Sequence, residues 1–249
     1  LNMPKSKYEQ IYKSLKKKID SGEYNEGAYL PSENTLIQIY DCSRNTVRRA
    51  VSHLTMEGYV QPHHGKGVRV IHSNSDNQPK YDYLITDAEG VYATGKRYGF
   101  SVRNKVIAFE ELTIDEHLAQ KTGFPKGIQV YLIQRVRYID DVAKMIDTSL
   151  LRKDVVGKMN EKIAEKSLFN YYSKNLGMEI ATIKRKITMV EATPLDEKYL
   201  ELGDFNCLPM ITSRIYNNEG TKFEFSESRN RPDLFVFNSI TSRSLAPKK

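Results

Sequence analysis

The sequence predicts an α+β protein in two parts: an N-terminal winged helix-turn-helix and a C-terminal α+β domain around an antiparallel sheet. Within residues 1–72, three short segments with a helical apolar period are followed by a glycine-containing hairpin. Residues 73–82 are polar, contain one proline and show no periodicity, which is typical of a linker. Residues 83–249 then mix strand-like and short helical runs, as α+β domains do.

Composition and charge indicate a soluble protein with an anionic partner. The 249 residues carry a net charge of +7, and residues 1–72 hold 11 Lys+Arg against 7 Asp+Glu. A basic N-terminal part predicts a polyanionic partner, although charge that only keeps a protein soluble gives the same composition. Two distant cysteines indicate no disulfide framework, and no apolar run is long enough to span a membrane. We therefore expect a cytoplasmic protein without a membrane partner.

Apolar stripes and capping residues predict three helices in residues 1–72. The first spans residues 7–21, and the second begins after its expected N-cap, Ser32. The third follows within a few residues, with Ser43 as its N-cap and Gly58 at its end. The side chains expected to face inward are Ile11, Leu15, Ile19, Leu36, Ile39, Tyr40, Val47, Ala50, Val51 and Leu54. Two short helices so close together predict a helix-turn-helix, whose second helix enters the major groove of DNA.

The polar face of the third helix and the hairpin tip predict the DNA contacts. Arginine pairs with the O6 and N7 atoms of guanine, and threonine or asparagine bonds bases or phosphates. The string "TVRRAV" alone is more typical of a solvated helix face than of a DNA contact. The hairpin "GYVQPHHGKGVRVI" favours DNA binding, because glycines at its tip let the backbone approach phosphates. The candidate DNA-binding residues are Ser32, Asn34, Arg44, Asn45, Thr46, Arg48, Arg49, His64, Gly65 and Lys66.

The stretch "LIQRVRYID", residues 132–140, places two arginines on an apolar face of a predicted strand. Side chains alternate between the two faces of a strand, so Arg135 and Arg137 point the same way, about 7 Å apart. Both faces carry apolar residues, and neither is expected to be freely solvated. Because an unpaired buried charge is too costly to keep, an anion must meet the two guanidinium groups.

Two kinds of anion meet this requirement, and the sequence leaves both open. One is an internal carboxylate, for which Asp147 and Glu224 are candidates because each lies in a strand-like run. The other is a phosphate ligand, which arginine binds through two hydrogen bonds. Arg229 and Arg231 favour the ligand, because four arginines that converge on few carboxylates leave a surplus of positive charge. Ser167 is expected to cap a helix whose free N–H groups suit phosphate, although a cap without a ligand is commoner.

Residues 83–249 also show a weak internal repeat. Strands are expected at 102–112, 128–139, 143–150, 180–192, 207–217, 222–229 and 234–238, and helices at 113–122, 152–159, 167–176 and 193–202. The run "ELTIDEHLAQKTG" followed by "IQVYLIQRVRY" has the layout of "EATPLDEKYLELG" followed by "CLPMITSRIY": a threonine cap, a short helix, a glycine and a strand. Two related half-units around one sheet would place a crevice between them, where ligands often bind.

The first part of the chain resembles a known family. The residues "LPSE…SRNTVRRAVSHLTMEGYV…HHGKGVRV" are similar to the winged helix-turn-helix of the GntR family of bacterial transcription regulators along residues 7–72. Asn34 departs from the family pattern, because some relatives have arginine there. A homodimer on a palindromic operator is expected, because a symmetric operator mirrors a two-fold protein. The residues that the resemblance places on DNA are Arg44, Thr46, Arg48, His64 and Gly65.

The second part resembles the effector-binding domain of the HutC-type branch of this family, the UTRA domain, which has a chorismate-lyase-like fold. The runs "VYLIQRVRYIDD", "KSLFNYY", "EATPLDEKYLELG" and "FEFSESRNRPDLFVF" carry the resemblance, and the last is most similar to trehalose-responsive members from Gram-positive bacteria. The resemblance implies a small effector, often a sugar phosphate. The implied phosphate ligands are Arg135, Arg137 and Ser167, and the residues implied to hold sugar hydroxyls or to help neutralise charge are Asp147, Glu224 and Arg231. Neither the residue pattern nor the resemblance assigns a part of the pocket wall to residues 85–100.

The sequence and the resemblance together predict a DNA-binding repressor of a trehalose-utilisation operon, released from DNA by trehalose 6-phosphate. The alternatives are a regulator that responds to glucosamine 6-phosphate or N-acetylglucosamine 6-phosphate, and a ligand-independent DNA binder. An enzyme is not expected, because Gly-x-Ser-x-Gly, His-Glu-x-x-His and P-loop motifs are absent from the sequence. No cofactor is expected, and His63, His64 and His72 lack the spacing of a metal site.

Overall fold

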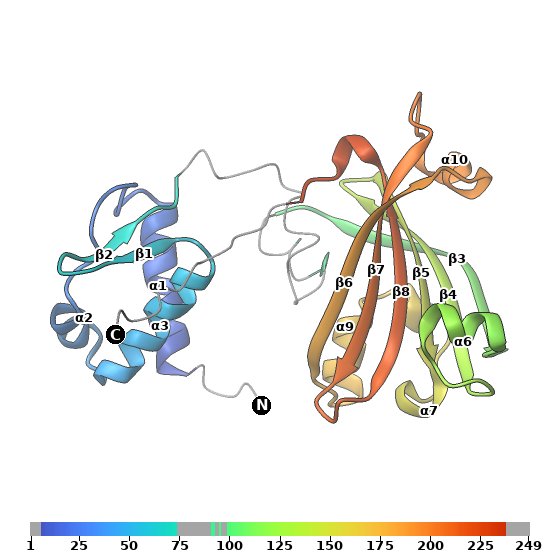
Figure 1. Cartoon of the computed structure of the whole chain (residues 1–249), viewed down its shortest axis with the longest axis horizontal. Helices are drawn as coiled ribbons and strands as arrows, with labels where there is room; N and C mark the ends of the chain where they lie inside the picture. Colours follow the sequence, from blue (N-terminus) through green and yellow to red (C-terminus); the bar gives the residue numbers. More distant parts are fainter. Residues whose placement is uncertain (1–5, 74–90, 93–94, 96–98, 238–249) are drawn as a thin grey trace, which may run out of the picture. The chain divides into compact units, whose positions relative to one another are not determined.

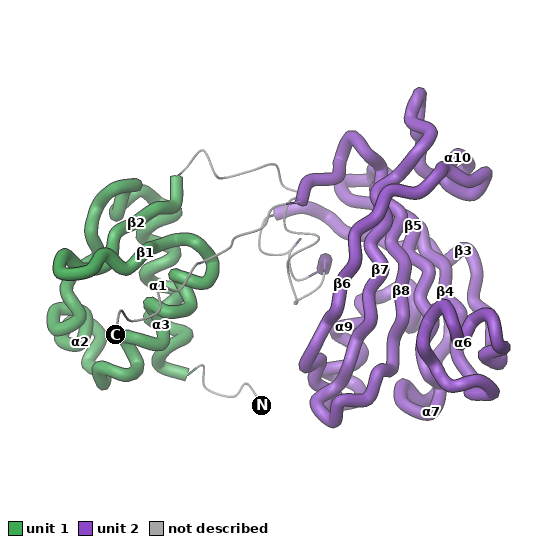
Figure 2. The backbone as a smooth tube through the Cα atoms, in the orientation of Figure 1, with its two compact units in different colours: residues 1–79, 238–249 green, residues 80–237 purple. Residues whose placement is uncertain are grey.

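A computed structural model of the chain describes residues 6–73, 91–92, 95 and 99–237 (Figure 1). The chain divides into two compact units, residues 1–79 with 238–249 and residues 80–237 (Figure 2). Most of the expected linker, residues 74–82, lies outside the described residues. Among the helices of the described ranges, none is long and apolar enough to cross a membrane.

The first unit contains three helices and a two-stranded antiparallel hairpin. The elements are α1 (Lys7–Asp20), α2 (Glu33–Tyr40), α3 (Arg44–Met56), β1 (Val60–His63) and β2 (Gly67–Val70). The side chain of Ser32 accepts the Thr35 N–H at the start of α2, and Ser43 accepts the Thr46 N–H at the start of α3. Each bond satisfies a donor that the helix leaves unpaired, and both predicted N-caps are confirmed.

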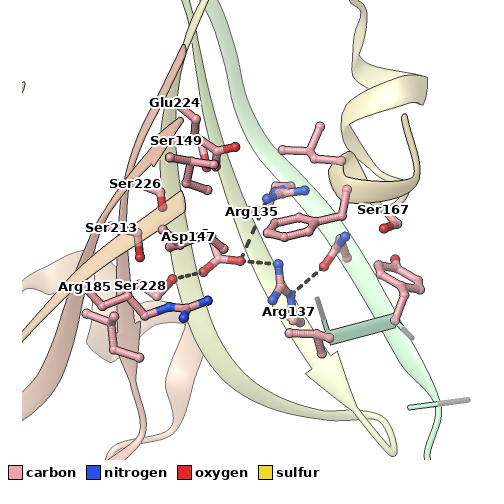
Figure 3. Close-up of a pocket in the computed structure, with 18 residues that line it drawn as sticks. Arg135, Arg137, Asp147, Ser149, Ser167, Arg185, Ser213, Glu224, Ser226 and Ser228 are labelled. Atoms are coloured by element: carbon pink, nitrogen blue, oxygen red, sulfur yellow. Dashed lines mark hydrogen bonds and ion pairs between the residues drawn. The ribbon is translucent and has the colours of Figure 1, made fainter. Parts of the chain in front are cut away.

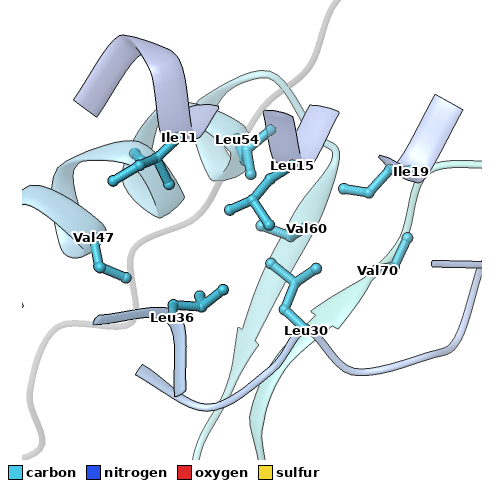
Figure 4. Close-up of a cluster of buried hydrophobic side chains, with 10 residues drawn as sticks. Ile11, Leu15, Ile19, Leu30, Leu36, Val47, Leu54, Val60 and Val70 are labelled. Carbon is cyan, nitrogen blue, oxygen red and sulfur yellow. The ribbon is translucent and has the colours of Figure 1, made fainter. Parts of the chain in front are cut away.

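The helices and the hairpin share one apolar core (Figure 4). Ile11, Leu15 and Leu54 are completely buried between α1 and α3, and Val60 and Val70 close the core from the hairpin. The helical period of the sequence predicts Ile11, Leu15 and Leu54 correctly, because the apolar stripes of α1 and α3 face each other in this core. The core therefore fixes α3 against α1 and leaves the opposite side of α3 exposed.

One inward-facing residue of α2 is predicted wrongly. Ile39 is 59% exposed, whereas Leu36 is buried and Ile37 and Tyr40 are partly buried against the core. The reason is the direction of the stripe. The core-facing arc of α2 runs from Leu36 through Tyr40 to Ile37, and Ile39 lies on the other side of Leu36.

The second unit is built on one six-stranded antiparallel sheet with strand order β3-β4-β5-β8-β7-β6. The strands are β3 (Val102–Thr113), β4 (Gln129–Ile139), β5 (Val142–Arg152), β6 (Ile180–Glu191), β7 (Cys207–Asn217) and β8 (Lys222–Asn230). Six of the seven expected strands are confirmed. The strand expected at 234–238 is wrong over 234–237: Pro232–Leu234 forms a short 3-10 helix, η3, and residues 235–237 are irregular. Proline lacks the N–H that a sheet needs, so it favours this turn.

The strand order confirms the internal repeat. β3, α6 (Glu116–Thr122) and β4 form one strand–helix–strand unit, and β6, α10 (Pro194–Leu200) and β7 form the other (Figure 1). β5 follows the first strand–helix–strand repeat and β8 follows the second, and β5 and β8 pair at the centre of the sheet. The second helix begins at Thr193 as expected. The first begins at Asp115 rather than Thr113, because the Asp115 carboxylate accepts a backbone N–H of the first turn.

Helices cover one face of the sheet at two places. Beneath α6 lies a buried cluster that contains Val130, Leu150 and Phe225, and beneath α10 lies a second that contains Val136 and Ile146. On β4 and β5 these residues alternate with side chains of the other face.

The other face of the sheet is covered by short helical segments. These are α7 (Lys153–Val156), α8 (Glu161–Ala164), α9 (Leu168–Asn170) and the π-helix η2 (Tyr171–Asn175). The helix expected at 152–159 is shorter because Gly157 ends it with a φ of +69°. The helix expected at 167–176 starts where predicted but becomes π-helical from Tyr171. β4 is thus covered on both faces, as its two apolar faces predict.

The carboxylate of Asp196 ties α10 to the sheet. It is fully buried and accepts hydrogen bonds from Arg229 of β8, with Nε 2.8 Å from Oδ1 and Nη2 2.6 Å from Oδ2. The backbone N–H and hydroxyl of Thr193 also donate to it. Burial alone would raise the pKa of Asp196, but the hydrogen bonds from Arg229 and Thr193 outweigh burial and lower the pKa below its ordinary value.

Asp196→Asn is expected to lower the free energy of unfolding of the second unit by about 3 kcal/mol, because the Arg229 guanidinium loses its counter-charge. Urea unfolding measures this change. The control is Asp154→Asn, which removes an exposed carboxylate that pairs with Arg152, and it should cost less than about 1 kcal/mol. Equal effects of the two substitutions would contradict the role of Asp196.

The lowered pKa of Asp196 also predicts a pH dependence. A carboxylate whose pKa is lower in the folded state stabilises the protein fully above its unfolded pKa, here 3.8, and loses that effect as the pH falls through the folded value. The stability difference between the wild type and Asp196→Asn should therefore stay constant from pH 7 to about pH 5 and narrow in more acid solution. A difference unchanged at pH 3 would contradict this.

Candidate functional site

The first candidate site is the exposed face of α3, next to the start of α2. Arg44 and Arg48 are exposed, and their Nε atoms lie 3.0 Å from the two different carboxylate oxygens of Glu33. Arg44 also donates through Nη2 to the side-chain oxygen of Asn34 at 3.1 Å. Asn45 is exposed beside them on α3. Two of the candidate DNA-binding residues thus pair with one carboxylate that sequence reasoning did not single out, and a third, Asn34, contacts Arg44.

The other candidate DNA-binding residues have different surroundings. Ser32 and Thr46 take part in the helix caps. The Arg49 guanidinium carbon lies 3.8 Å from the centre of the Tyr8 ring, so Arg49 stacks on α1 rather than joining the others. The exposed turn of the hairpin consists of His64, Gly65 and Lys66. Gly65 has a φ of +74°, which glycine adopts readily, and a Cβ there would meet no atom within 4 Å.

The second candidate site is a cavity of about 110 Å³ in the second unit (Figure 3). It lies against the face of the sheet opposite α6 and α10, and all six strands contribute side chains to its wall. Ser167 and Phe169, from the start of α9, close it on another side. Its polar strand residues are Asn104, Arg135, Arg137, Asp147, Ser149, Arg185, Ser213, Glu224, Ser226 and Ser228.

Arg135 and Arg137 share the carboxylate of Asp147, which lies opposite Arg135 on β5. Oδ2 of Asp147 is 2.5 Å from Nη2 of Arg137 and 3.9 Å from Nη2 of Arg135, and Ser228 donates to Oδ1 (Figure 3). The internal ion pair that the sequence left open is therefore present. One carboxylate nevertheless serves two guanidinium groups, which leaves a positive charge on this wall.

Arg135 is almost completely buried, with 4% of its surface exposed. Its Nη1 donates to the carbonyl of Ala164 at 3.1 Å, whereas its buried Nε has no hydrogen-bond partner among the described residues. Burial lowers the pKa of Arg135, and the nearby Asp147 opposes that shift. A buried guanidinium N–H without an acceptor costs free energy, so this wall favours a ligand that brings acceptor oxygens.

Glu224 is the second carboxylate of the wall, and hydroxyl groups hold it. The Tyr172 hydroxyl donates to Oε2 at 2.8 Å, and the Ser149 hydroxyl donates to Oε1 at 3.3 Å. Burial raises the pKa of Glu224 and, more strongly, that of Tyr172. Burial thus disfavours the charge of Glu224, whereas the hydrogen bonds from Tyr172 and Ser149 and the nearby Arg135 favour it.

Two of the four arginines expected to converge lie elsewhere. Arg229 pairs with Asp196 beneath α10, and Arg231 pairs with Asp233 in η3. Ser228 lines the cavity, and side chains alternate along β8, so the neighbouring Arg229 faces the opposite side of the sheet. The prediction that four arginines converge on one site is therefore wrong for Arg229 and Arg231.

Ser167 lines the cavity as expected, but its helix adds less than expected. It caps α9 by accepting the Asn170 N–H at 3.2 Å. Only three residues of α-helix follow before the π-helical turn, so this short segment gives no argument for an anion site at a helix terminus. Ser167 therefore contributes its hydroxyl group.

Sequence reasoning missed the polar residues on the far side of the cavity. Ser149, Ser226 and Ser213 lie opposite one another across β5, β8 and β7, and Arg185 of β6 lies opposite Ser213. The run "EFSES" carried a usable signal, because Glu224, Ser226 and Ser228 occupy alternate positions and so share one face of a strand. Arg185 had no such signal, because lysines and threonines surround it in the sequence.

The histidines of the first unit have other partners. His63 Nδ1 is 2.7 Å from the Tyr29 hydroxyl, and the His72 ring stacks on Tyr59 with 4.3 Å between ring centres. Within residues 6–73, 91–92, 95 and 99–237, no group of three or more His, Cys, Asp or Glu is arranged to hold a metal ion.

Comparisons with known proteins match both units. The family described as "Bacterial regulatory proteins, gntR family" matches residues 7–70, and the family described as "UTRA domain" matches residues 97–236. The transcriptional regulator TreR of Bacillus subtilis is 25% identical over 241 residues, which cover 97% of this chain and 99% of TreR.

Two solved structures share the fold. The regulator YydK from Bacillus subtilis aligns with a TM-score of 0.78 at 22% identity, over 95% of this chain and 99% of YydK. The effector-binding domain of the B. subtilis trehalose repressor TreR aligns with a TM-score of 0.52 at 21% identity, over 57% of this chain and 99% of that domain. With its winged helix-turn-helix and its six-stranded second unit, the chain belongs to the GntR family of bacterial transcriptional regulators, in the HutC-type branch that carries a UTRA domain.

Proposed function

We propose that the chain is a repressor of a sugar-utilisation operon, released from a palindromic operator by a phosphorylated sugar, trehalose 6-phosphate. The observation that carries the effector class is the pair Arg135 and Arg137, which share the single carboxylate of Asp147 on a cavity wall. Guanidinium groups bind phosphate through paired, charge-assisted hydrogen bonds. A phosphate group would supply both the charge and the acceptor atoms that this wall favours.

The rest of the wall suits the hydroxyl groups of a sugar. Ser149, Ser213 and Ser226 form a row of hydroxyls across the centre of the sheet, and Glu224 adds a buried acceptor. Serine hydroxyls both donate and accept, which matches the dual character of sugar hydroxyls. The similarity to TreR, a trehalose repressor, directs the proposal to trehalose 6-phosphate, and glucosamine 6-phosphate and N-acetylglucosamine 6-phosphate remain the alternatives.

Release from DNA requires that the two DNA-binding heads of a homodimer, the winged helix-turn-helix of each chain, can adopt two arrangements. The effector shifts the equilibrium only if it binds one arrangement more tightly than the other. In the proposed mechanism, the effector-bound dimer holds its two heads at a separation that no longer matches the half-sites. A ligand-independent DNA binder would give no such change, so release by the sugar phosphate separates the two functions.

Calorimetric titration of the full chain tests the effector. Trehalose 6-phosphate should bind at least about tenfold more tightly than trehalose, which lacks only the phosphate, because charge-assisted hydrogen bonds contribute about 1.5–3 kcal/mol. Tighter binding of glucosamine 6-phosphate or N-acetylglucosamine 6-phosphate would reassign the sugar and keep the phosphate site. Equal affinities for trehalose and its phosphate would contradict the phosphate site.

Arg137→Gln should weaken binding of trehalose 6-phosphate by about tenfold or more, because it removes one guanidinium from the shared pair. Arg137 is a better probe than Arg135, because removal of the almost completely buried Arg135 would destabilise the fold. The matched control is Arg231→Gln, because Arg231 pairs with Asp233 outside the cavity. The affinity of this variant for trehalose 6-phosphate should stay within about twofold of that of the wild type. Similar losses in both variants would show that the cavity arginines have no special role.

Arg48→Ala should weaken specific binding of DNA by about 5- to 150-fold and leave the sugar-phosphate affinity unchanged. Arg48 is exposed on α3, and an arginine paired with guanine contributes about 1–3 kcal/mol of discrimination. The readouts are gel-shift affinity for a duplex that the wild-type chain selects from a randomised pool, and calorimetry with the effector. A variant that binds the selected duplex as tightly as the wild type would exclude Arg48 from DNA reading.

A further inference from the structure

We propose that Glu33 is a positioning residue for DNA recognition: it holds Arg44 and Arg48 as a fixed pair and so sets how well the protein discriminates one DNA sequence from another. The proposed function assigns no role to this residue, and the inference does not depend on the effector.

The geometry links three side chains through one carboxylate. Oε1 of Glu33 lies 3.0 Å from Nε of Arg44, and Oε2 lies 3.0 Å from Nε of Arg48. Arg44 and Arg48 are four residues apart on α3, so they lie on the same side of that helix. Each oxygen takes one arginine, and the carboxylate therefore sets the spacing between the two guanidinium groups.

The carboxylate is itself held in place. Glu33 is the first residue of α2, directly after its N-cap Ser32, and 34% of its side chain is exposed. An acidic side chain in the first turn is favoured by the partial positive charge of the helix start. Because the capped turn fixes the backbone of Glu33, its carboxylate can restrict the motion of the Arg44 and Arg48 side chains.

The ion pairs use one edge of each guanidinium group. Arginine has five N–H donors in a planar fork. Nε of each arginine lies 3.0 Å from a Glu33 oxygen, and the Nε–H of Arg48 donates a hydrogen bond to Oε2. Arg44 uses Nη2 as well, toward Asn34. The remaining terminal N–H groups suit the O6 and N7 atoms of guanine. An arginine already fixed in one plane loses less conformational freedom when it binds a base.

The same carboxylate opposes binding through phosphates alone. Sequence-independent affinity comes from lysine and arginine contacts with the DNA backbone. An arginine that leaves Glu33 for a phosphate exposes a negative charge beside a polyanion, whereas base reading can keep the ion pair. Exposed ion pairs contribute only about 0–1 kcal/mol to stability, so stability gives little reason for this arrangement.

The test compares Glu33→Gln with Glu23→Gln in the full chain. Glu23 is also an exposed acid of the first unit, with an ion pair to Lys18 at 2.7 Å, and both substitutions change the net charge equally. A second variant, Glu33→Asp, keeps the charge on a side chain one methylene shorter. The probes are a duplex that the wild-type chain selects from a randomised pool and the same duplex with its selected positions scrambled.

The measured quantity is the ratio of the affinities for the selected and scrambled duplexes, as a function of salt. In Glu33→Gln this ratio should fall at least about tenfold, with tighter binding to the scrambled duplex and a salt dependence steeper by about one phosphate contact. Glu33→Asp should give an intermediate fall. Glu23→Gln should keep the wild-type ratio within about twofold.

Several outcomes would overturn the proposal. Equal ratios for Glu33→Gln and Glu23→Gln would reduce Glu33 to an ordinary surface charge, and a pool without an enriched sequence would remove sequence reading altogether. Circular dichroism checks that Glu33→Gln folds, and if it does not, a wild-type ratio in Glu33→Asp is the overturning result. Unchanged calorimetry with trehalose 6-phosphate separates this result from any failure of the effector proposal.

Discussion

The second unit depends on a charge imbalance that the sheet creates at its own centre. Asp147 is the carboxylate to which Arg135 and Arg137 both turn, and it cannot neutralise two guanidinium groups. Glu224 is a second buried carboxylate on this wall, where Tyr172 and Ser149 donate hydrogen bonds to it and burial raises its pKa. Ordinary proteins avoid an arginine as deeply buried as Arg135. Under the proposed function, a bound anion would supply the missing acceptor and counter-charge, so that binding would also stabilise the sheet.

Strand alternation then separates two tasks by only one residue. Arg229 follows Ser228 on β8, yet it faces α10 and pairs with the fully buried Asp196. That ion pair is locally complete, with the carboxylate also bonded by Thr193. Arg229 thus binds a carboxylate through both Nε and Nη2, whereas Nε of the cavity residue Arg135 has no acceptor among the described residues. This contrast between Arg229 and Arg135 distinguishes the two faces of the sheet more clearly than their positions in the sequence.

Much of this organisation could be predicted from the sequence. Helical period and capping serines located the head, and the apolar faces of β4 indicated that Arg135 and Arg137 would meet an anion. The face on which Arg229 lies could have been predicted by following the alternation of side chains along β8 from Glu224. The predicted burial of Ile39 was wrong because a short helix has a narrow core-facing arc, and the direction of that arc depends on residues far away in the sequence. The contacts of Glu33 with Arg44 and Arg48 could not be predicted, because they depend on the angle between α2 and α3, and no local pattern encodes that angle.

The internal repeat has a consequence for how such a cavity can change over evolution. The half formed by β3, β4 and β5 supplies Arg135, Arg137 and Asp147, whereas the half formed by β6, β7 and β8 supplies Arg185, Glu224 and most of the serines. The two halves follow one structural plan but contribute different groups: the first provides the paired arginines, and the second provides most of the hydroxyl groups. Under the proposed function, the phosphate would contact the first half and the sugar hydroxyls mainly the second. Substitutions on β7 or β8 would then change the preferred sugar while the phosphate contacts of β4 stay intact.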